Sequence, residues 1–133
     1  MRIMVDTNII LAAAVFGSKW LLNMIDNIVE NHYLVISSGI VDELYDVVRR
    51  KAPEQMEVLE KFIWNIKCKF VYSPEKVEEK DRLFKIRDEK DYIILHTAII
   101  ENVDIFITND NDFFDVDIKR PKIIKPQEFN EKY

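Results

Sequence analysis

The sequence predicts a single α/β domain over residues 1–133, built on a central parallel β-sheet of about five strands with helices on both faces. Short apolar, β-branched runs alternate along the chain with longer segments whose apolar residues recur at helical spacing, a pattern typical of parallel sheets. The chain contains no internal repeat and no linker, and its length is sufficient for one hydrophobic core. We therefore expect one compact three-layer unit.

The chain opens on a predicted strand at residues 3–5, an apolar run that ends at Asp6. A helix is expected over residues 8–16. A second helix, over residues 19–30, has apolar residues recurring three and four positions apart. The apolar run at residues 33–36 predicts the second strand.

The middle of the chain predicts two more helices and one strand. A helix begins at Ile40 and ends at the basic run Arg49-Arg50-Lys51, where positive charge complements the helix dipole. Pro53 is expected to start the next helix, because proline is favoured in the first helical turn. Residues 67–72 alternate between polar and apolar types, which favours an edge strand.

The last part of the chain begins with residues 73–90, the most charged and least periodic stretch, where we expect only a short helix around residues 77–84. A clear helix and a clear strand follow it. The remaining expected elements are a helix at 93–101, a strand at 104–108, a helical turn starting at Phe113, a strand at 122–124 and a helical turn from Pro126.

Composition excludes several classes of protein. Two glycines leave no room for glycine-rich phosphate loops, and a single cysteine, Cys68, excludes an intrachain disulfide or a multi-cysteine zinc site. No apolar stretch approaches the length of a membrane span, and no leader pattern precedes the first strand, so we expect a cytoplasmic protein without membrane contact. A net charge of −5 argues against broad binding to polyanions, although local basic patches or cations can reverse the sign at a site.

Four acidic residues are expected to meet at one edge of the sheet. Asp6 and Asp110 each follow a predicted buried strand, and Glu43 and Asp91 lie near the starts of helices that follow loops on that edge. The carboxyl ends of parallel strands are the usual ligand-binding edge of such sheets. Clustered carboxylates repel one another unless a cation binds them, and Mg²⁺ or Mn²⁺ suits oxygen ligands of this kind. Such a site fits metal-assisted hydrolysis of a phosphodiester.

Each of these acids also has a structural explanation when taken alone. Glu43 and Asp91 gain from a helix dipole in any protein, and Asp110 lies in a sequence that suits a turn. Asp88 is interpreted as the N-cap of the helix that contains Asp91, with support of the site as a second role. Asp112 could be a further metal ligand, a residue that supports the ligands, or a cap for the turn at Phe113.

Other residues with chemical potential have simpler roles. His32 and His96 have no cysteine or histidine partner at metal-ligand spacing, and Cys68 is interpreted as a packing residue. Trp20 and Trp64 lie on helical stripes, so we expect them in the core or in a dimer contact. Arg49, Arg50 and Lys51 either complement the helix dipole or contact the phosphate groups of a ligand.

Four short motifs together resemble the PIN-domain family across essentially the whole chain, and in particular its small VapC-like toxin branch. The first motif is Val5-Asp6-Thr7-Asn8, and the second is Val41-Asp42-Glu43-Leu44 followed by Arg49-Arg50. The third is Asp88-Glu89-Lys90-Asp91 with Ala98, the fourth is Ile107-Thr108-Asn109-Asp110-Asn111-Asp112-Phe113, and the closing segment Ile123 to Phe129 resembles the tail of that branch. Asn109 departs from the glycine of many relatives.

The resemblance implies a PIN-like α/β/α fold and a Mg²⁺- or Mn²⁺-dependent endoribonuclease. It implies metal-site and catalytic acids at Asp6, Glu43, Asp91 and Asp110, with Asp112 as a further acid. Asn8 and Thr108 match positions that support the site. It further implies a homodimer and a separate antitoxin protein that covers the acidic cleft.

Two alternatives compete with this interpretation. The chain could be a non-catalytic RNA-binding or scaffold domain that uses its acids only to hold a cation. It could also be a phosphoryl-transfer protein with Asp6 as nucleophile. The Asp-x-Asp pattern of aspartyl phosphatases is absent, however, because Asn8 stands at the second position.

Overall fold

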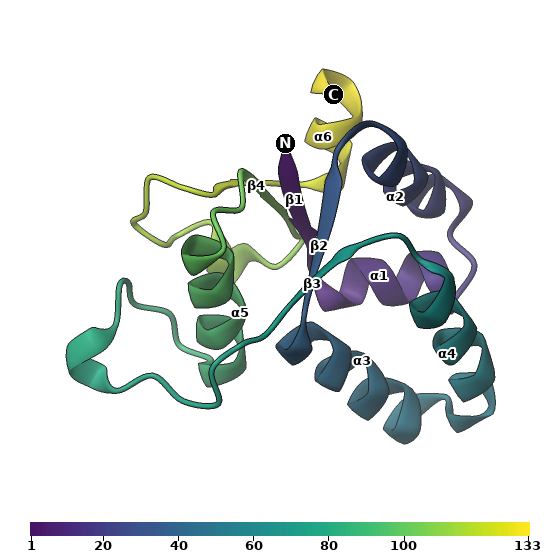
Figure 1. Ribbon diagram of the computed structural model, residues 1–133, viewed down its shortest axis with the longest axis horizontal. Coiled ribbons are helices and arrows are strands. Elements are labelled where there is room, and N and C mark those ends of the chain that lie inside the picture. Colours follow the sequence, from purple (N-terminus) through teal and green to yellow (C-terminus); the bar gives the residue numbers. More distant parts are fainter.

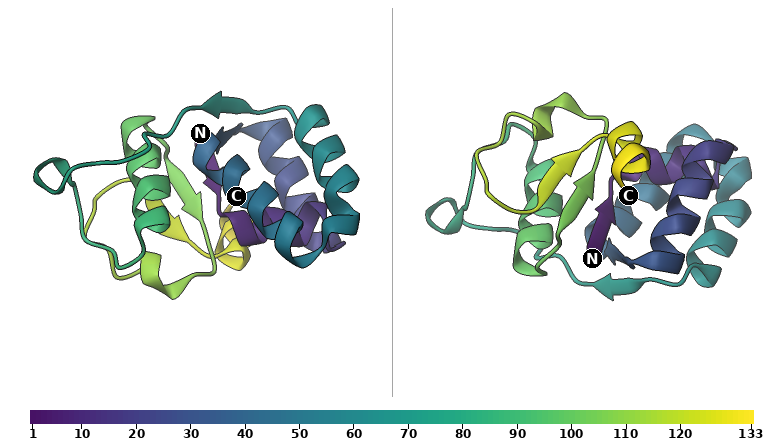
Figure 2. Two further views of the ribbon diagram at one scale, coloured as in Figure 1. Left: turned by 90° about the horizontal axis from the view of Figure 1, so that it is seen from below. Right: turned by 90° about the horizontal axis from the view of Figure 1, so that it is seen from above.

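A computed structural model describes residues 1–133 and contains one five-stranded sheet in which all neighbouring strands are parallel (Figures 1 and 2). The strand order is β3-β2-β1-β4-β5, so the first strand of the chain is the central one. The predicted fold class is confirmed. The strands are β1 (Arg2–Val5), β2 (Tyr33–Ser37), β3 (Lys69–Val71), β4 (Ile105–Ile107) and β5 (Lys122–Ile124).

Helices cover both faces of the sheet. Figures 1 and 2 show α1, α2 and α4 on one side of the strands and α5 on the other. No single helix is long and apolar enough to cross a membrane; α1 and α2 meet that test only together, as a pair bent by 110°. The helices are α1 (Thr7–Ala14), α2 (Lys19–Asn31), α3 (Ser38–Lys51), α4 (Met56–Asn65), α5 (Glu89–Ile100) and α6 (Pro126–Lys132), with short 3₁₀ turns η1 (Pro53–Gln55), η2 (Glu79–Asp81) and η3 (Asn111–Phe113).

The central strands form the middle of one continuous hydrophobic core. In β1, residues Ile3 to Val5 are completely buried, as are Phe106 and Ile107 of β4. Strands buried on both faces read as unbroken apolar runs, which is why these segments lack the alternation of a half-exposed strand. The backbone ends of β1 and β4 are therefore held rigidly, and so are the polar residues that follow them.

Three local expectations need correction. The helix predicted around residues 77–84 is only the single 3₁₀ turn η2, because this segment has few apolar residues to bury. Trp20 and Trp64 are 50% and 84% exposed, which excludes the core and leaves a surface contact as their remaining predicted role. Helix α5 begins at Glu89, one turn before the range 93–101 that the apolar pattern predicted and directly after the predicted cap Asp88.

Candidate metal centre

The pairing of β1 with β4 places Asp6 at the carboxyl edge of the sheet beside Thr108. Val5 pairs with Ile107, so the next residue of each strand emerges at the same level. Asp6 is only 7% exposed, and its Oδ1 accepts a hydrogen bond from the backbone N–H of Thr7 at 2.8 Å. Asp6 also caps α1. The first motif of the sequence therefore joins the central strand to the first helix through one buried carboxylate.

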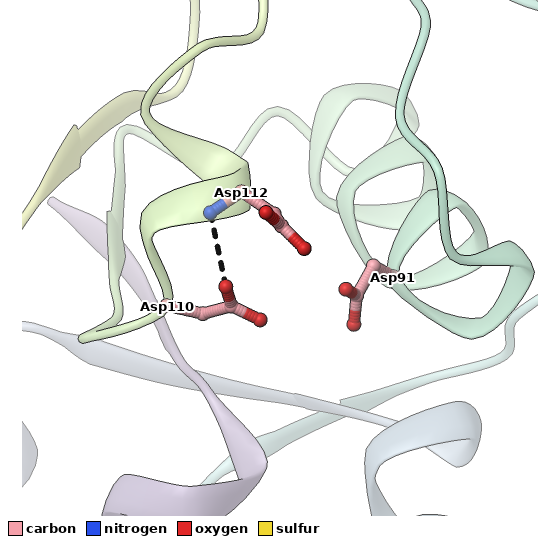
Figure 3. A group of neighbouring side chains, drawn as sticks. All are labelled: Asp91, Asp110 and Asp112. Carbon is pink, nitrogen blue, oxygen red and sulfur yellow. Dashed lines mark hydrogen bonds between the residues drawn. The ribbon is translucent and has the colours of Figure 1, made fainter.

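Thr108 links Asp6 to the segment that carries Asp110. Its hydroxyl donates to Asp6 Oδ2 at 2.7 Å and accepts from the backbone N–H of Asp110 at 3.0 Å. Asp110 in turn accepts from the backbone N–H of Asp112 at 2.9 Å, a bond drawn in Figure 3. This chain of hydrogen bonds fixes the loop after β4, so that the second predicted strand-end acid lies near the first.

The loop after β3 holds the two helices that carry Glu43 and Asp91. The backbone N–H of Ser73 donates to Ser38 Oγ at 2.8 Å, at the start of α3, and Thr97 of α5 donates to Ser73 Oγ at 3.0 Å. A Cβ on Gly39 would lie 3.1 Å from Ser73 Oγ, so glycine permits this close approach. The role of Ser73 was not predicted, because a single serine in a polar loop carries no distinguishing pattern.

Asp88 is the predicted N-cap of α5. Its Oδ1 accepts from the backbone N–H groups of Lys90 and Asp91 at 2.8 and 3.1 Å, which confirms the expected cap. The cap fixes the first helical turn and with it the carboxylate of Asp91. The same side chain places a negative charge close to Asp91.

Loss of this cap is expected to weaken the whole domain measurably. We predict that Asp88→Ala lowers the free energy of unfolding by about 1 kcal/mol, because two N–H groups at the start of α5 lose their acceptor. Asp88→Asn keeps the acceptor oxygen and is expected to stay within a few tenths of a kcal/mol of the parent. Urea unfolding followed by circular dichroism measures both, and equal stability of all three proteins would contradict the capping role.

Three carboxylates converge in front of the sheet edge. Oxygens of Asp91, Asp110 and Asp112 all lie within 4.8 Å of one another, and Figure 3 shows the side chains pointing toward a common space from α5 and from the segment that follows β4. Ligands on opposite sides of one Mg²⁺ are about 4.2 Å apart, so small side-chain rotations would bring all three onto one ion. The carboxylate of Asp112 thus lies beside those of the predicted ligands Asp91 and Asp110, and its backbone N–H forms part of the η3 turn.

Electrostatic repulsion connects these carboxylates with Asp6 and Glu43. Burial, followed by the charges of Glu43 and Asp110, raises the pKa of Asp6 to about 6, against the lowering effect of its two hydrogen bonds. Burial and then the charges of Asp88, Asp110, Asp6 and Glu43 raise the pKa of Asp91 to about 7. Asp6, Glu43, Asp91, Asp110 and Asp112 form one group, which we call the carboxylate centre.

The donor set of the carboxylate centre suits a hard divalent cation. All five side chains offer oxygen, none offers nitrogen or sulfur, and their mutual repulsion is what a cation would relieve. The hydroxyl of Thr7, the residue after Asp6, is buried and is the only buried side-chain polar atom without a hydrogen-bond partner. The residues present therefore fit Mg²⁺ or Mn²⁺ better than the softer metals that favour histidine or cysteine.

The remaining predicted site residues form no hydrogen bond or ion pair with the carboxylate centre. Asn8 lies on the first turn of α1, two residues after Asp6, and its side chain is exposed. Arg49, Arg50 and Lys51 form the exposed last turn of α3, and Arg49 pairs with Asp46 at 3.0 Å. Arg50 lies seven residues beyond Glu43, about 10 Å along the helix axis. The basic run thus lies two helical turns away from the nearest acid of the centre.

A cleft of about 510 Å³ borders the carboxylate centre at Glu43. It lies between α3 and α5, and the loop after β3 contributes Tyr72 and Ser73 to its wall. Tyr72 is 80% exposed and follows β3 directly, so it lies at the same edge of the sheet as Asp6. The centre is therefore open to a molecule approaching along this edge.

Comparison with known proteins identifies the family. The family model described as the PIN domain matches residues 2–112, which include the first three motifs, all of the fourth except its last residue, and the whole carboxylate centre. The chain belongs to the PIN-domain family. No curated protein matches the sequence significantly.

A solved structure supports the same fold. The chain is similar to a chain in the crystal structure of VapBC2 from Rickettsia felis bound to a DNA fragment from their promoter, with a TM-score of 0.69 and 23% identity. The match covers 94% of this chain and 98% of the other. The predicted PIN-like architecture is thus confirmed by both sequence family and structure.

Proposed function

We propose that this protein is a metal-dependent endoribonuclease that hydrolyses RNA phosphodiester bonds at the carboxylate centre. The observation that carries the proposal is the cluster of Asp91, Asp110 and Asp112 at the edge of the sheet, with Asp6 and Glu43 near enough for their charges to raise the pKa of Asp91, in a member of the PIN-domain family. No basic residue balances Asp6, Glu43 or Asp91 by an ion pair. This negative charge would repel RNA without a cation.

The protein's contribution is to hold oxygen ligands in place. Asp6, Glu43, Asp91, Asp110 and Asp112 would bind Mg²⁺ or Mn²⁺, which when bound supplies an activated water and offsets charge on the reacting phosphate. Thr108 keeps the Asp6 carboxylate oriented, and the Asp88 cap does the same for the start of α5. These contacts position the acids before any ligand arrives.

Cleavage of a labelled single-stranded RNA tests the proposal. We expect cutting in Mg²⁺ or Mn²⁺ and none in EDTA. Glu43→Gln is expected to cut at least 100-fold more slowly, because it removes one charged ligand while keeping the size of the side chain. Glu57→Gln is the matched control, since Glu57 is an exposed acid on α4 that pairs with Lys61. Equal rates for the two variants, or undiminished cutting in EDTA, would contradict the proposal.

We also propose that the nuclease acts in the cytoplasm as the toxin of a toxin–antitoxin pair and forms a homodimer. The likeness to a chain of the VapBC2 structure supports an antitoxin partner. Exposed apolar side chains on α2 and α4, Trp20 and Trp64 above all, support a protein contact on that side of the sheet. Size-exclusion chromatography with light scattering tests the dimer, and Trp64→Ser is expected to weaken it if α4 forms the contact.

A further inference from the structure

Arg87 is the only basic residue that forms an ion pair with the carboxylate centre. Its Nη2 donates to Asp112 Oδ2 at 3.3 Å. Every other ion pair of the structure joins residues outside the centre, including the pair between Arg49 and Asp46. One guanidinium therefore contacts the carboxylate centre, and it does so at Asp112.

A structural role does not explain this arginine. The Arg87 side chain is 87% exposed and that of Asp112 is 42% exposed, so solvent screens the pair and it contributes little to stability. Arg82, in the same segment, shows what a structural arginine looks like here. Its side chain is 20% exposed, binds Glu89 through two contacts of 2.6 and 2.7 Å, and lies 4.4 Å from the centre of the Tyr92 ring.

The hydrogen-bonding capacity of Arg87 is largely unused. A guanidinium has five N–H donors, and Asp112 is the only acceptor that Arg87 contacts within the protein. Its backbone position is nevertheless well defined, because the next residue is the Asp88 cap of α5. Arg87 thus presents a free, planar donor group from a fixed point at the rim of the centre, the arrangement that suits two oxygens of one phosphate.

We propose that Arg87 binds the RNA phosphate that enters the carboxylate centre. This inference rests on the proposed nuclease function and adds a specific phosphate contact to it. Asp112 links the Arg87 guanidinium to the other acids of the centre. One of its oxygens contacts Arg87, and its carboxylate lies within 4.8 Å of those of Asp91 and Asp110. When Arg87 exchanges its bond to Asp112 for bonds to phosphate oxygens, the Asp112 carboxylate becomes free to bind the cation. Phosphate binding and cation binding therefore support each other.

The test measures RNA binding separately from cleavage. Fluorescence anisotropy with a labelled single-stranded RNA compares Asp6→Asn protein with and without Arg87→Ala. The Mg²⁺ concentration is high enough to occupy the centre despite the weaker metal binding expected of Asp6→Asn. We expect Arg87→Ala to weaken binding about 10-fold or more. The slope of log affinity against log salt concentration should become shallower by about 0.7, the value for one lost contact to a single strand. Arg87→Lys should keep the slope and recover part of the affinity, because lysine keeps the charge but not the planar donors.

Arg120→Ala is the matched control. Arg120 is also an exposed arginine paired with an aspartate, but its partner Asp104 precedes β4 and so lies at the opposite edge of the sheet. This variant should bind RNA as the parent does. In the active protein, Arg87→Ala should lower kcat/KM about 10-fold or more, with unchanged thermal stability and a partial recovery in Arg87→Lys.

The outcomes separate this inference from the nuclease proposal. Equal RNA affinity and equal salt slope for Arg87→Ala and Arg120→Ala would overturn the phosphate contact even if the protein cleaves RNA. Loss of Mn²⁺ binding in Arg87→Ala with RNA affinity retained would also overturn it, because Arg87 would then act only through Asp112. Weakened RNA binding in Arg87→Ala, in a parent protein that never cleaves RNA, would keep the contact and reject the nuclease.

Discussion

Asp6→Asn is expected to reduce RNA cleavage about 1,000-fold or more while leaving the protein folded. Asparagine has the shape of aspartate, so it can still accept from the Thr7 N–H and contact Thr108. The substitution removes the negative charge of the most buried acid of the carboxylate centre. A buried charge attracts a cation more strongly than an exposed one, because less water screens it. A 1,000-fold loss corresponds to about 4 kcal/mol of transition-state stabilisation.

Stability should move in the opposite direction from activity. Burial disfavours the charged form of Asp6, so in metal-free buffer at pH 8 the variant is expected to be at least as stable as the parent. Asp117→Asn is the matched control for activity, because Asp117 is exposed in the segment between η3 and β5. Cleavage kinetics and urea unfolding measure the two effects. A variant that unfolds, or one that retains more than a tenth of the parent rate, would contradict this role of Asp6.

The metal-free protein is expected to lose stability as the pH rises from about 4 to about 8. The pKa of Asp6 is raised from 3.8 to about 6 and that of Asp91 to about 7 in the folded state. The folded chain therefore binds more protons than the unfolded chain in this range, and the free energy of unfolding falls with increasing pH. For Asp6 alone the change amounts to about 3 kcal/mol. Asp91 is half-buried, so it adds a smaller loss of stability with increasing pH.

Urea unfolding in EDTA at several pH values measures the pH dependence of the free energy of unfolding. Comparison with Asp6→Asn gives the share of that dependence that Asp6 contributes. The variant should show a clearly weaker pH dependence than the parent. Mg²⁺ or Mn²⁺ should restore stability at pH 8 and have little effect near pH 5, because protons and metal ions compete for the same carboxylates. A parent protein whose stability rises with pH over this range would show that burial and the neighbouring charges do not raise the pKa values of Asp6 and Asp91 as the structure indicates.

Most of the fold and the acids of the site could be predicted because they depend on local patterns. The strand at residues 3–5 is an unbroken apolar run, and Asp6 ends it, so parallel pairing alone brings Asp6 to the ligand-binding edge. The Asp88 cap was predictable from its position before a helical pattern. The edge position of β3 was predictable from its alternation and is confirmed by the strand order.

The contacts that the sequence did not reveal connect residues far apart in the chain. Ser73 meets α3 and α5 only after the sheet has formed, and nothing in its neighbours indicates this. The contact of Arg87 with Asp112 is not predictable from the sequence, because the number of basic residues in a segment does not indicate which of them lies near the acids. The helix expected near residue 80 is only a 3₁₀ turn, because this charged and weakly periodic segment buries too few apolar side chains to stabilise a longer helix.

One titration tests the central claim, that the carboxylate centre binds the metal ion with which RNA is cleaved. Mn²⁺ binding, followed by electron paramagnetic resonance, and the initial rate of RNA cleavage are measured over the same Mn²⁺ concentrations for the parent and for Asp6→Asn. We predict that binding and rate reach half-saturation at the same concentration in the parent, and that Asp6→Asn weakens the binding and removes the rate. Cleavage that is already maximal before Mn²⁺ binds, or that persists in Asp6→Asn with the parent's Mn²⁺ dependence, would contradict the claim.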